Sequence, residues 1–475
     1  MGKTSPWKNF IWIGTALAIA MPLSAWEPRG VAAAAAASAA AASAASAPKV
    51  AFSDQRLSNG LRVLISEDHT APVCSVAVVY DVGSANERPG RTGFAHLFEH
   101  MMFKGSANVG SGEHFILIYN NGGTMNGTTN KDRTNYFETL PANQLELALF
   151  LESDRMRSLD ITKANLDNQR NAVQEERRQG VDNQPYGKSS EIFDALAYEH
   201  FAYKHSTIGS MDDLNAATVD DVAAFFKMYY APNNATLAIV GDVDSAKALA
   251  LVKKYFESIP RQPAPPAVDH KEPEQTAERR QSVDDPLARV PRVTIGYHVP
   301  PGNTKDYYAL DVLGSILSDG RSSRLYESVV RQKQLASGAF AGVYETRGPG
   351  LFEATGQALP GKNIADVESA IYAEIERVKT GTIEEWEIQK ARNEARRGLL
   401  SRLTSSLGRA SLLAENAVFW NDPNKINTET DAIAAVTVSD VQRVARQYLT
   451  AQNRTVVTTM PKAAAAADVS KKGGL

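Results

Sequence analysis

The sequence has 475 residues, of which 43% are hydrophobic and 22% charged, so the chain can bury an ordinary core and is not disordered throughout. Its length suits about three domains, or two larger ones. Lys and Arg number 51 against 54 Asp and Glu, and the net charge of -3 excludes the strongly basic surface typical of nucleic-acid-binding proteins. The single cysteine, Cys74, excludes an intramolecular disulfide framework and any metal site built from several thiolates. A site of histidines and carboxylates remains possible.

Residues 1–25 have the layout of a secretory signal peptide. Lysines precede the apolar run 10–21, which is short for a membrane span, and small residues follow it. The alternative is an uncleaved membrane anchor, because Leu23 stands where cleavage sites favour a small residue. We expect export to the periplasm of a Gram-negative bacterium, with no permanent membrane span once the signal is removed.

The next segment, residues 26–48, is rich in Ala and Ser and predicts a low-complexity tether. Beyond it, strand-like apolar runs mix with long helical patterns, which is typical of an α+β fold. The strand-like runs are 61–65, 75–80, 236–240, 293–297 and 455–459, and the clearest helical patterns are 141–159 and 219–230. Clustered prolines predict a linker at 259–275. We therefore expect an N-terminal domain at 49–258, a C-terminal domain at 276–462 and a flexible tail at 463–475.

The chain contains an internal repeat with a constant offset of 219 residues. Residues 218–236 and 437–455 both begin with a Thr suited to cap a helix, and both run through a helical pattern into a β-branched strand. At the same offset Glu176 aligns with Ala395, so this carboxylate exists only in the first copy. We infer two homologous α+β domains in tandem, each an antiparallel-rich sheet with helices on one face, and chemistry in the first domain alone.

The chemistry is carried by the run His96-Leu97-Phe98-Glu99-His100. On a helix, His96 and His100 project from one face, with Glu99 beside them. Two imidazoles at this spacing and a neighbouring carboxylate suit a zinc ion and the deprotonation of its water. The alternative, a pair of surface histidines on an amphipathic helix, conflicts with the apolar Leu97 and Phe98, which favour burial of the segment.

A catalytic zinc ion needs a third protein ligand and an open position for water. The repeat favours Glu176 over its neighbour Glu175, because Glu175 has a counterpart, Glu394, in the second copy, where no histidine pair occurs. A helix over 165–178 would place Gln169 and Glu176 on one face, two turns apart.

The histidine motif, followed 76 residues after His100 by Glu176, resembles the inverzincin zinc metallopeptidases of the pitrilysin and insulinase type. The half-length bacterial members and the mitochondrial processing peptidase look most similar. The resemblance covers nearly the whole chain beyond Pro48, including segments 122–126 and 323–326. It implies two domains that form half of a clamshell around peptide substrates, with one zinc ion per chain.

Carried over residue by residue, the resemblance makes His96, His100 and Glu176 the zinc ligands and Glu99 the general base. Asn126 lies in the segment that corresponds to the family's edge strand beside the metal, where an extended peptide binds by strand addition. Strand addition reads backbone conformation more than side chains, so short or unfolded peptides of many sequences are the expected substrates of this hydrolase.

The sequence departs from the family pattern at two places. Gln169 stands where the family has an acid that supports the metal ligands, and it can hydrogen-bond but brings no charge. In the second half Arg331 fits the family's substrate-binding arginine, but Ser337 stands at the tyrosine position and Tyr344 lies thirteen residues after Arg331. We therefore predict a heterodimer with a paralogous subunit that has the Arg/Tyr pair and lacks the zinc motif. A non-catalytic assembly or chaperone-like subunit and a self-sufficient homodimeric peptidase are the alternatives.

Overall fold

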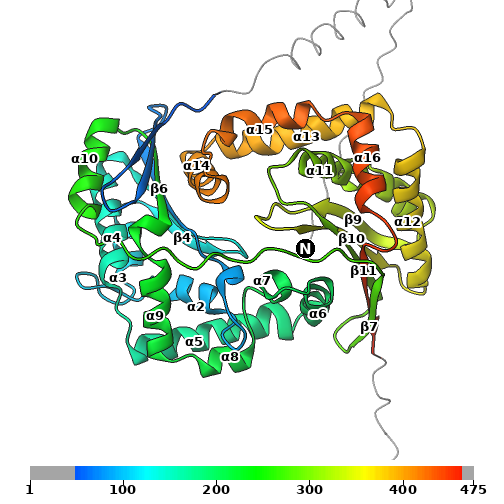
Figure 1. Cartoon of the computed structure of the whole chain (residues 1–475), viewed down its shortest axis with the longest axis horizontal. Helices are drawn as coiled ribbons and strands as arrows, with labels where there is room; N and C mark the ends of the chain where they lie inside the picture. Colours follow the sequence, from blue (N-terminus) through cyan, green and yellow to red (C-terminus); the bar gives the residue numbers. More distant parts are fainter. Residues whose placement is uncertain (1–48, 463–475) are drawn as a thin grey trace, which may run out of the picture. The chain divides into compact units, whose positions relative to one another are not determined.

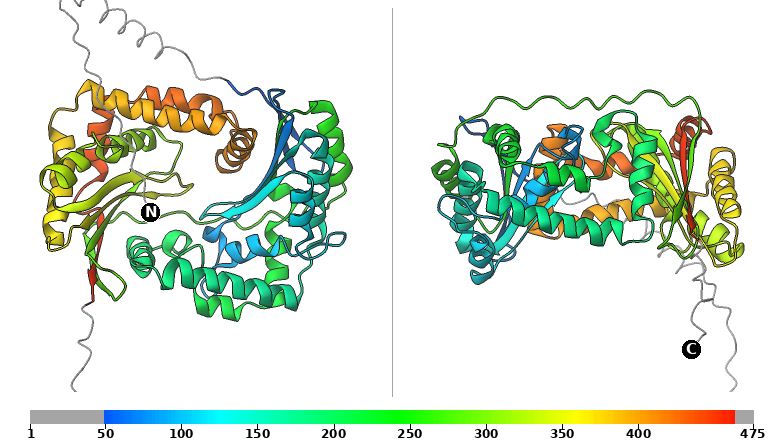
Figure 2. Two further views of the ribbon diagram at one scale, coloured as in Figure 1. Left: turned by 180° about the vertical axis from the view of Figure 1, so that it is seen from behind. Right: turned by 90° about the horizontal axis from the view of Figure 1, so that it is seen from below.

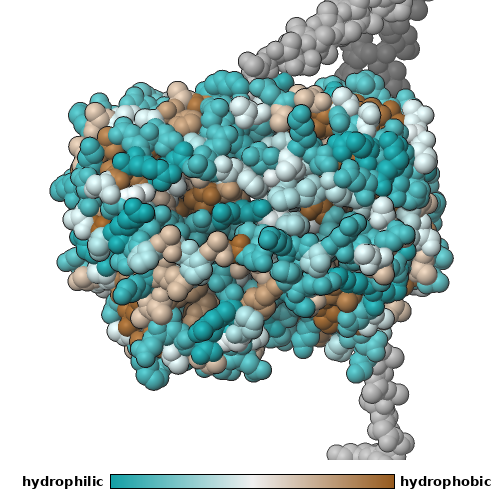
Figure 3. All heavy atoms as spheres, in the orientation of Figure 1, coloured by the Kyte–Doolittle hydropathy of each residue, from teal (hydrophilic) through white to brown (hydrophobic). Residues whose placement is uncertain are grey.

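The computed structural model describes residues 49–462 (Figure 1). The predicted signal peptide, tether and tail, 1–48 and 463–475, lie outside the described residues. Two mixed β-sheets with flanking helices follow each other along the chain, which confirms the predicted α+β class with two tandem units. No helix among residues 49–462 is both long and apolar enough to cross a membrane. The face seen in Figure 3 is largely hydrophilic, with separate apolar patches.

The first sheet has six strands in the order β1-β2-β6-β3-β5-β4. They are β1 (Ser53–Arg56), β2 (Arg62–Glu67), β3 (Val73–Tyr80), β4 (Thr124–Thr129), β5 (Thr134–Pro141) and β6 (Ala235–Gly241). The β2–β6 pair is parallel and the other pairs are antiparallel. The central strands β3 and β6 are rich in Val and Ile and are buried along nearly their whole length, because both faces of the sheet are covered. Strands β1 and β4 are the two edges of the sheet.

The first half of the chain also contains a series of helices, several of which pack on this sheet. They are α2 (Phe94–Met101), α3 (Glu113–Asn120), α4 (Leu145–Ser158), α5 (Lys163–Arg177), α6 (Gly187–Ala197), α7 (Phe201–Lys204), α8 (Met211–Ala216), α9 (Val219–Tyr229) and α10 (Ser245–Phe256), with short helical turns η1 (Ser84–Asn86), η2 (Ala142–Gln144), η3 (Arg178–Asp182) and η4 (Pro232–Asn234). Helix α5 begins where the Thr162 hydroxyl accepts a hydrogen bond from Asn165 N. The helices predicted at 141–159 and 219–230 are confirmed as α4 and α9.

The second sheet repeats the first. Its strands are β7 (Arg279–Asp285), β8 (Arg292–Val299), β9 (Ala336–Val343), β10 (Gly350–Ala358) and β11 (Arg454–Pro461); its helices are α11 (Lys305–Ser318), η5 (Tyr326–Gln332), α12 (Ile364–Thr380), α13 (Glu385–Leu403), α14 (Ser406–Trp420), α15 (Lys425–Ala434) and α16 (Val438–Tyr448). The order β7-β11-β8-β10-β9 has the pairing directions of β2-β6-β3-β5-β4. Thr218 and Thr437 form the same capping box at the starts of α9 and α16, which confirms the internal repeat.

Each half lends a helix to the sheet of the other half. Helix α14 packs on β3 and β6, where Leu413 is buried against Val79 and Val240 (Figures 1 and 2). In return α6 packs on β11 of the second sheet through Phe193, next to Leu351. The segment between α10 and β7, which includes the predicted linker, is an extended connection without helix or strand (Figure 2, right). The two sheets are therefore tied together by buried apolar contacts.

This exchange predicts that Leu413→Ala destabilises both halves although the residue lies in the second. Loss of a fully buried leucine leaves a cavity and costs about 2–5 kcal/mol of unfolding free energy. Leu287→Ala, at an exposed leucine, is the control and should change the free energy by less than about 0.5 kcal/mol. Urea unfolding followed by circular dichroism measures both; similar midpoints for the two variants would contradict the packing.

Candidate metal centre

The histidine motif forms helix α2, whose apolar side packs into the core of the first half. Leu97, Phe98 and Met101 are buried, and the Phe98 ring lies 4.5 Å from that of Tyr230. His96 lies on the opposite side of the helix, and His100 lies one turn later on the same side. Both are partly exposed. The helix thus has the orientation that its amphipathic pattern predicts.

Glu176, on α5, faces both histidines. Its Oε2 lies 3.6 Å from His96 Nε2 and 3.3 Å from His100 Nε2, and the three ligand atoms are all within 4.8 Å of one another. Zinc bonds of about 2.0–2.1 Å in a tetrahedron place neighbouring ligand atoms about 3.3–3.5 Å apart. The spacing and the His₂Glu donor set therefore fit a catalytic zinc ion, and the half-exposed Glu176 leaves one side of the site open to solvent.

His96 is prepared to act as a neutral ligand. Burial, together with the nearby His100, lowers the pKa of His96 to about 4, so its ring carries no charge at neutral pH. Its Nδ1 is buried and has no hydrogen-bond partner among the described residues. Nε2 is the nitrogen that faces Glu176. A metal ion at Nε2 would meet an imidazole that need not first lose a proton.

Glu99 lies on the same helix but is held by the edge strand β4. The Thr129 hydroxyl donates a hydrogen bond to Glu99 Oε2 (2.6 Å). Burial raises the pKa of Glu99, while this bond and His100 oppose the rise. A Cβ on Gly127 would lie 3.0 Å from Glu99 Cγ, so a larger residue here would require the Glu99 side chain to shift by a few tenths of an ångström. The carboxylate is thus fixed between α2 and β4, beside the three ligand atoms and not among them.

The free edge of β4 can accept another strand. Within the described sheet β4 pairs only with β5, so no strand lies along its other side. Asn126 is exposed on this strand, and its side-chain oxygen accepts a hydrogen bond from Gly127 N (2.9 Å). The hydrogen bond from Thr129 to Glu99 was not predicted from the sequence, although Thr129 belongs to the segment that resembles the family's edge strand. Its signal is the two-residue alternation that puts positions 127 and 129 on the face toward α2.

The structure does not bring the remaining predicted residues into contact with the three candidate ligand atoms. Gln169 is buried on α5, and its amide donates to Asn168 (2.6 Å). Arg331 lies in η5 of the second half, where it is exposed and forms an ion pair with Glu327 (2.5 Å). Ser337 lies on the edge strand β9 and Tyr344 follows that strand with 74% of its surface exposed.

A second group with metal-like geometry lies in the core of the first half, and its chemistry disfavours a cation. His114, Glu138 and Glu152 have ligand atoms within 4.8 Å of one another, but all three are sealed from solvent. Arg155 lies among them, paired with Glu152 and stacked over Tyr136 at 4.5 Å. Burial raises the pKa of each carboxyl to about 7, and Arg155 opposes the rise. Because the guanidinium already supplies the positive charge, this group is a buried structural network.

Comparisons with known proteins agree with the tandem fold. Residues 62–210 match the family model described as insulinase (peptidase family M16), and residues 216–395 match that of the peptidase M16 inactive domain. The chain is 34% identical over 408 residues to the zinc protease PqqE of Helicobacter pylori, which covers 85% of this chain and 92% of that protein. The second match begins in the first half, at residue 216, and continues into the second half, where no histidine pair occurs.

Solved structures show the same fold. The crystal structure of a protease from Helicobacter pylori, 34% identical, has a TM-score of 0.83 and covers 87% of this chain and 100% of that one. The first half of the periplasmic protease PqqL from Escherichia coli, 21% identical, has a TM-score of 0.70 and covers 88% of this chain and 94% of that structure.

The low pKa of His96 predicts an acid-sensitive stability in the metal-free protein. Between about pH 6.5 and pH 4 the unfolded chain binds a proton at His96 that the folded chain does not, so stability falls as the pH falls. In metal-free protein, NMR titration should find the His96 ring neutral at pH 5. The exposed His69, whose pKa is raised by Asp242, should be charged there. A His96 ring that titrates near pH 6.5 would contradict the prediction.

Proposed function

We propose that the chain, which belongs to the insulinase family of peptidases (M16), is a zinc-dependent endopeptidase that hydrolyses peptide bonds in short or unfolded peptides. The observation that carries this proposal is the convergence of His96, His100 and Glu176 beside the carboxylate of Glu99. Support also comes from PqqE, a relative that is itself named a zinc protease. All three ligands and the base are present, which disfavours a non-catalytic assembly or chaperone-like role.

His96, His100 and Glu176 would hold the ion, which when bound would supply a Lewis acid that activates water and polarises the scissile carbonyl. Glu99 would accept the water's proton at its carboxylate and return it to the departing amine. Its raised pKa favours this role, because a more basic carboxylate takes the proton more readily. Thr129 would keep the carboxylate aimed at the water through its hydrogen bond.

Strand β4 would hold the substrate as an added strand. Its free edge offers backbone groups to an extended peptide, and Asn126 lies exposed along it. This binding mode needs a segment that is free to become extended. Short and unfolded chains meet that requirement, whereas a folded protein has its strands already paired.

We also propose that the chain works as the zinc-bearing subunit of a heterodimer in the periplasm. Ser337 stands at the position of the family's tyrosine, and Arg331 is engaged by Glu327. A paralogous subunit could supply the missing Arg/Tyr pair. Export is supported by the signal-like N-terminus and by the fold shared with PqqL, a periplasmic protease.

Glu99→Gln tests the catalytic assignment. The variant keeps the shape of the side chain but cannot take a proton, so it should retain one zinc ion per chain and lose about 10²- to 10⁴-fold in kcat. Glu175→Gln, at an exposed carboxylate next to Glu176, is the matched control and should keep both zinc and activity. Zinc content and chelator-sensitive cleavage of a peptide library measure both effects. Peptidase activity retained by the Glu99 variant would refute the assignment.

The heterodimer predicts weak activity of the chain purified alone. Adding a co-purified paralogue with the Arg/Tyr pair should raise kcat/KM about 10²-fold, the usual effect of a donor that stabilises developing negative charge. Titration of the paralogue into a fixed amount of the chain measures the gain. Activity of the isolated chain that does not increase with the paralogue would favour the homodimeric alternative.

A further inference from the structure

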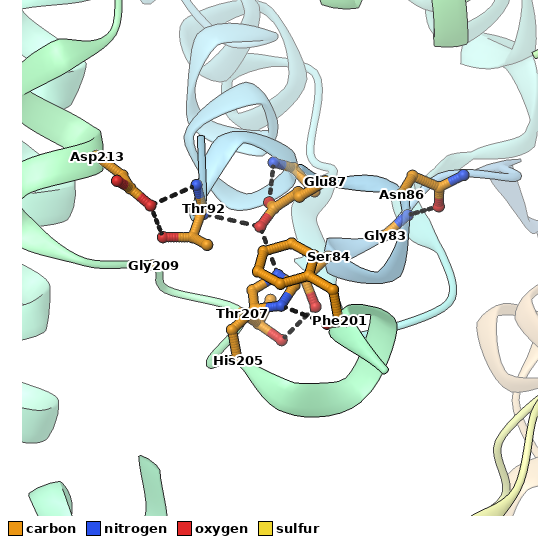
Figure 4. Close-up of polar contacts among 12 residues, drawn as sticks. Gly83, Ser84, Asn86, Glu87, Thr92, Phe201, His205, Thr207, Gly209 and Asp213 are labelled. Carbon is orange, nitrogen blue, oxygen red and sulfur yellow. Dashed lines mark hydrogen bonds and ion pairs between the residues drawn. The ribbon is translucent and has the colours of Figure 1, made fainter. Parts of the chain in front are cut away.

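The N-terminus of the metal helix α2 is capped by a side chain from outside the helix. Its N-cap residue is Gly93, which has φ +83 and no side chain to accept the free N–H groups of the first turn. Glu87 does so instead, with its carboxylate accepting from Gly93 N (2.9 Å) and Ala95 N (2.8 Å) (Figure 4). A negative group at a helix N-terminus is also favoured by the helix dipole. Glu87 therefore fixes the end of the helix from which His96 projects.

Glu87 is in turn held by His205. His205 Nε2 lies 2.9 Å from Glu87 Oε2, and its Nδ1 lies 2.9 Å from the backbone oxygen of Phe201, whose ring stacks on the imidazole at 4.3 Å (Figure 4). The oxygen of Phe201 is an obligate acceptor, and an ionised Glu87 is another. The His205 ring thus bridges the Phe201 backbone and the Glu87 carboxylate through its two nitrogens. Burial raises the pKa of Glu87, and His205 opposes the rise.

The segment that starts at His205 also forms hydrogen bonds and backbone contacts with the turn before α2. The Asp213 carboxylate accepts from Thr92 N (2.9 Å) and from the Thr92 hydroxyl (2.5 Å) (Figure 4). Gly209, at φ +75, packs directly on Gly93, since a Cβ at Gly209 would lie 2.4 Å from Gly93 Cα. Backbone meets backbone here, so the separation of the two segments has little freedom to vary.

The same segment is bonded to the helix that carries the third ligand. Arg177, the residue after Glu176, donates to the backbone oxygen of Gly209 (2.6 Å). One turn earlier on α5, the Gln174 amide donates to the side-chain oxygen of Asn215 (2.7 Å). Residues 205–215, which we term the brace, are thereby attached to both helices that provide ligands.

We propose that the brace sets the separation between α2 and α5, and that Glu87 and His205 are positioning residues of the metal site. The proposal rests on the proposed function, since it takes the ion to be zinc held by residues of these two helices. Donor atoms from α2 and α5 must meet within about 3.3–3.5 Å, so a small displacement of either helix opens the site. Partners that orient metal ligands from behind commonly govern metal affinity.

Two substitutions of His205 test the brace in the full chain. His205→Phe keeps the stack on Phe201 and removes both hydrogen bonds, whereas His205→Gln keeps one donor. We expect the Phe variant to bind zinc about 10- to 100-fold more weakly than wild type, measured by competition with a chromophoric chelator, and the Gln variant to fall between. The absorption spectrum of bound Co²⁺ should change in intensity, because it reports ligand geometry. KM should stay near that of the wild type while kcat falls.

The matched control is His298→Phe. His298 also bonds a backbone oxygen, that of Ala197 (3.0 Å), and packs edge-on against Tyr198, but it lies on β8 of the second sheet. The zinc affinity of the His298→Phe variant should equal that of the wild type. Circular dichroism establishes whether each variant folds. If His205→Phe does not fold, the zinc affinity of His205→Gln tests the proposal.

The possible results distinguish failure of the brace proposal from failure of the proposed zinc peptidase function. Wild-type zinc affinity in the folded His205 variants, or an equal loss in the control, would overturn the brace and leave the zinc peptidase proposal intact. A wild-type chain that binds no zinc at all would overturn both.

Discussion

The separation between helices α2 and α5 is the constraint on which the site depends. Two of the proposed ligand atoms come from one helix and the third from the other, and tetrahedral coordination tolerates only a narrow range of distances between them. The surroundings hold both helices from several sides. The apolar side of α2 packs in the core, its N-terminus is capped by Glu87, and residues 205–215 reach both helices.

The two copies of the fold share the features that stabilise it, but only the first copy contains the candidate metal ligands. Both copies have the same strand order and the same Thr capping box, because these features serve packing and are needed wherever the fold is built. The ligand set is different. Glu176 is replaced by Ala395, and a buried histidine or carboxylate is costly unless it is paired or bound. The second copy contributes in another way, since α14 covers the first sheet that carries the site.

Several parts of the fold and site were accessible from the sequence because they follow local periodicity. The four-residue spacing of His96 and His100 puts them on one helical face, and the 219-residue repeat predicted the tandem fold and singled out Glu176 as the candidate third ligand. The Thr caps marked the starts of α9 and α16. Gln169 shows the limit of such reasoning: its place on the α5 face was predictable, but its hydrogen bond to the neighbouring Asn168 was not.

The sequence alone determined the class of fold, its duplication and the identity of the ligand candidates. All three follow from the spacing of residue types along the chain. Tertiary structure alone decided that Thr129 bonds Glu99 and Gly127 lies against it, that α14 crosses to the other sheet, and that His205 contacts Glu87, which caps α2. These contacts join residues tens to hundreds of positions apart and repeat with no period. They depend on how two sheets and two helices come together, because packing in three dimensions, and not the order of residues, sets which atoms meet.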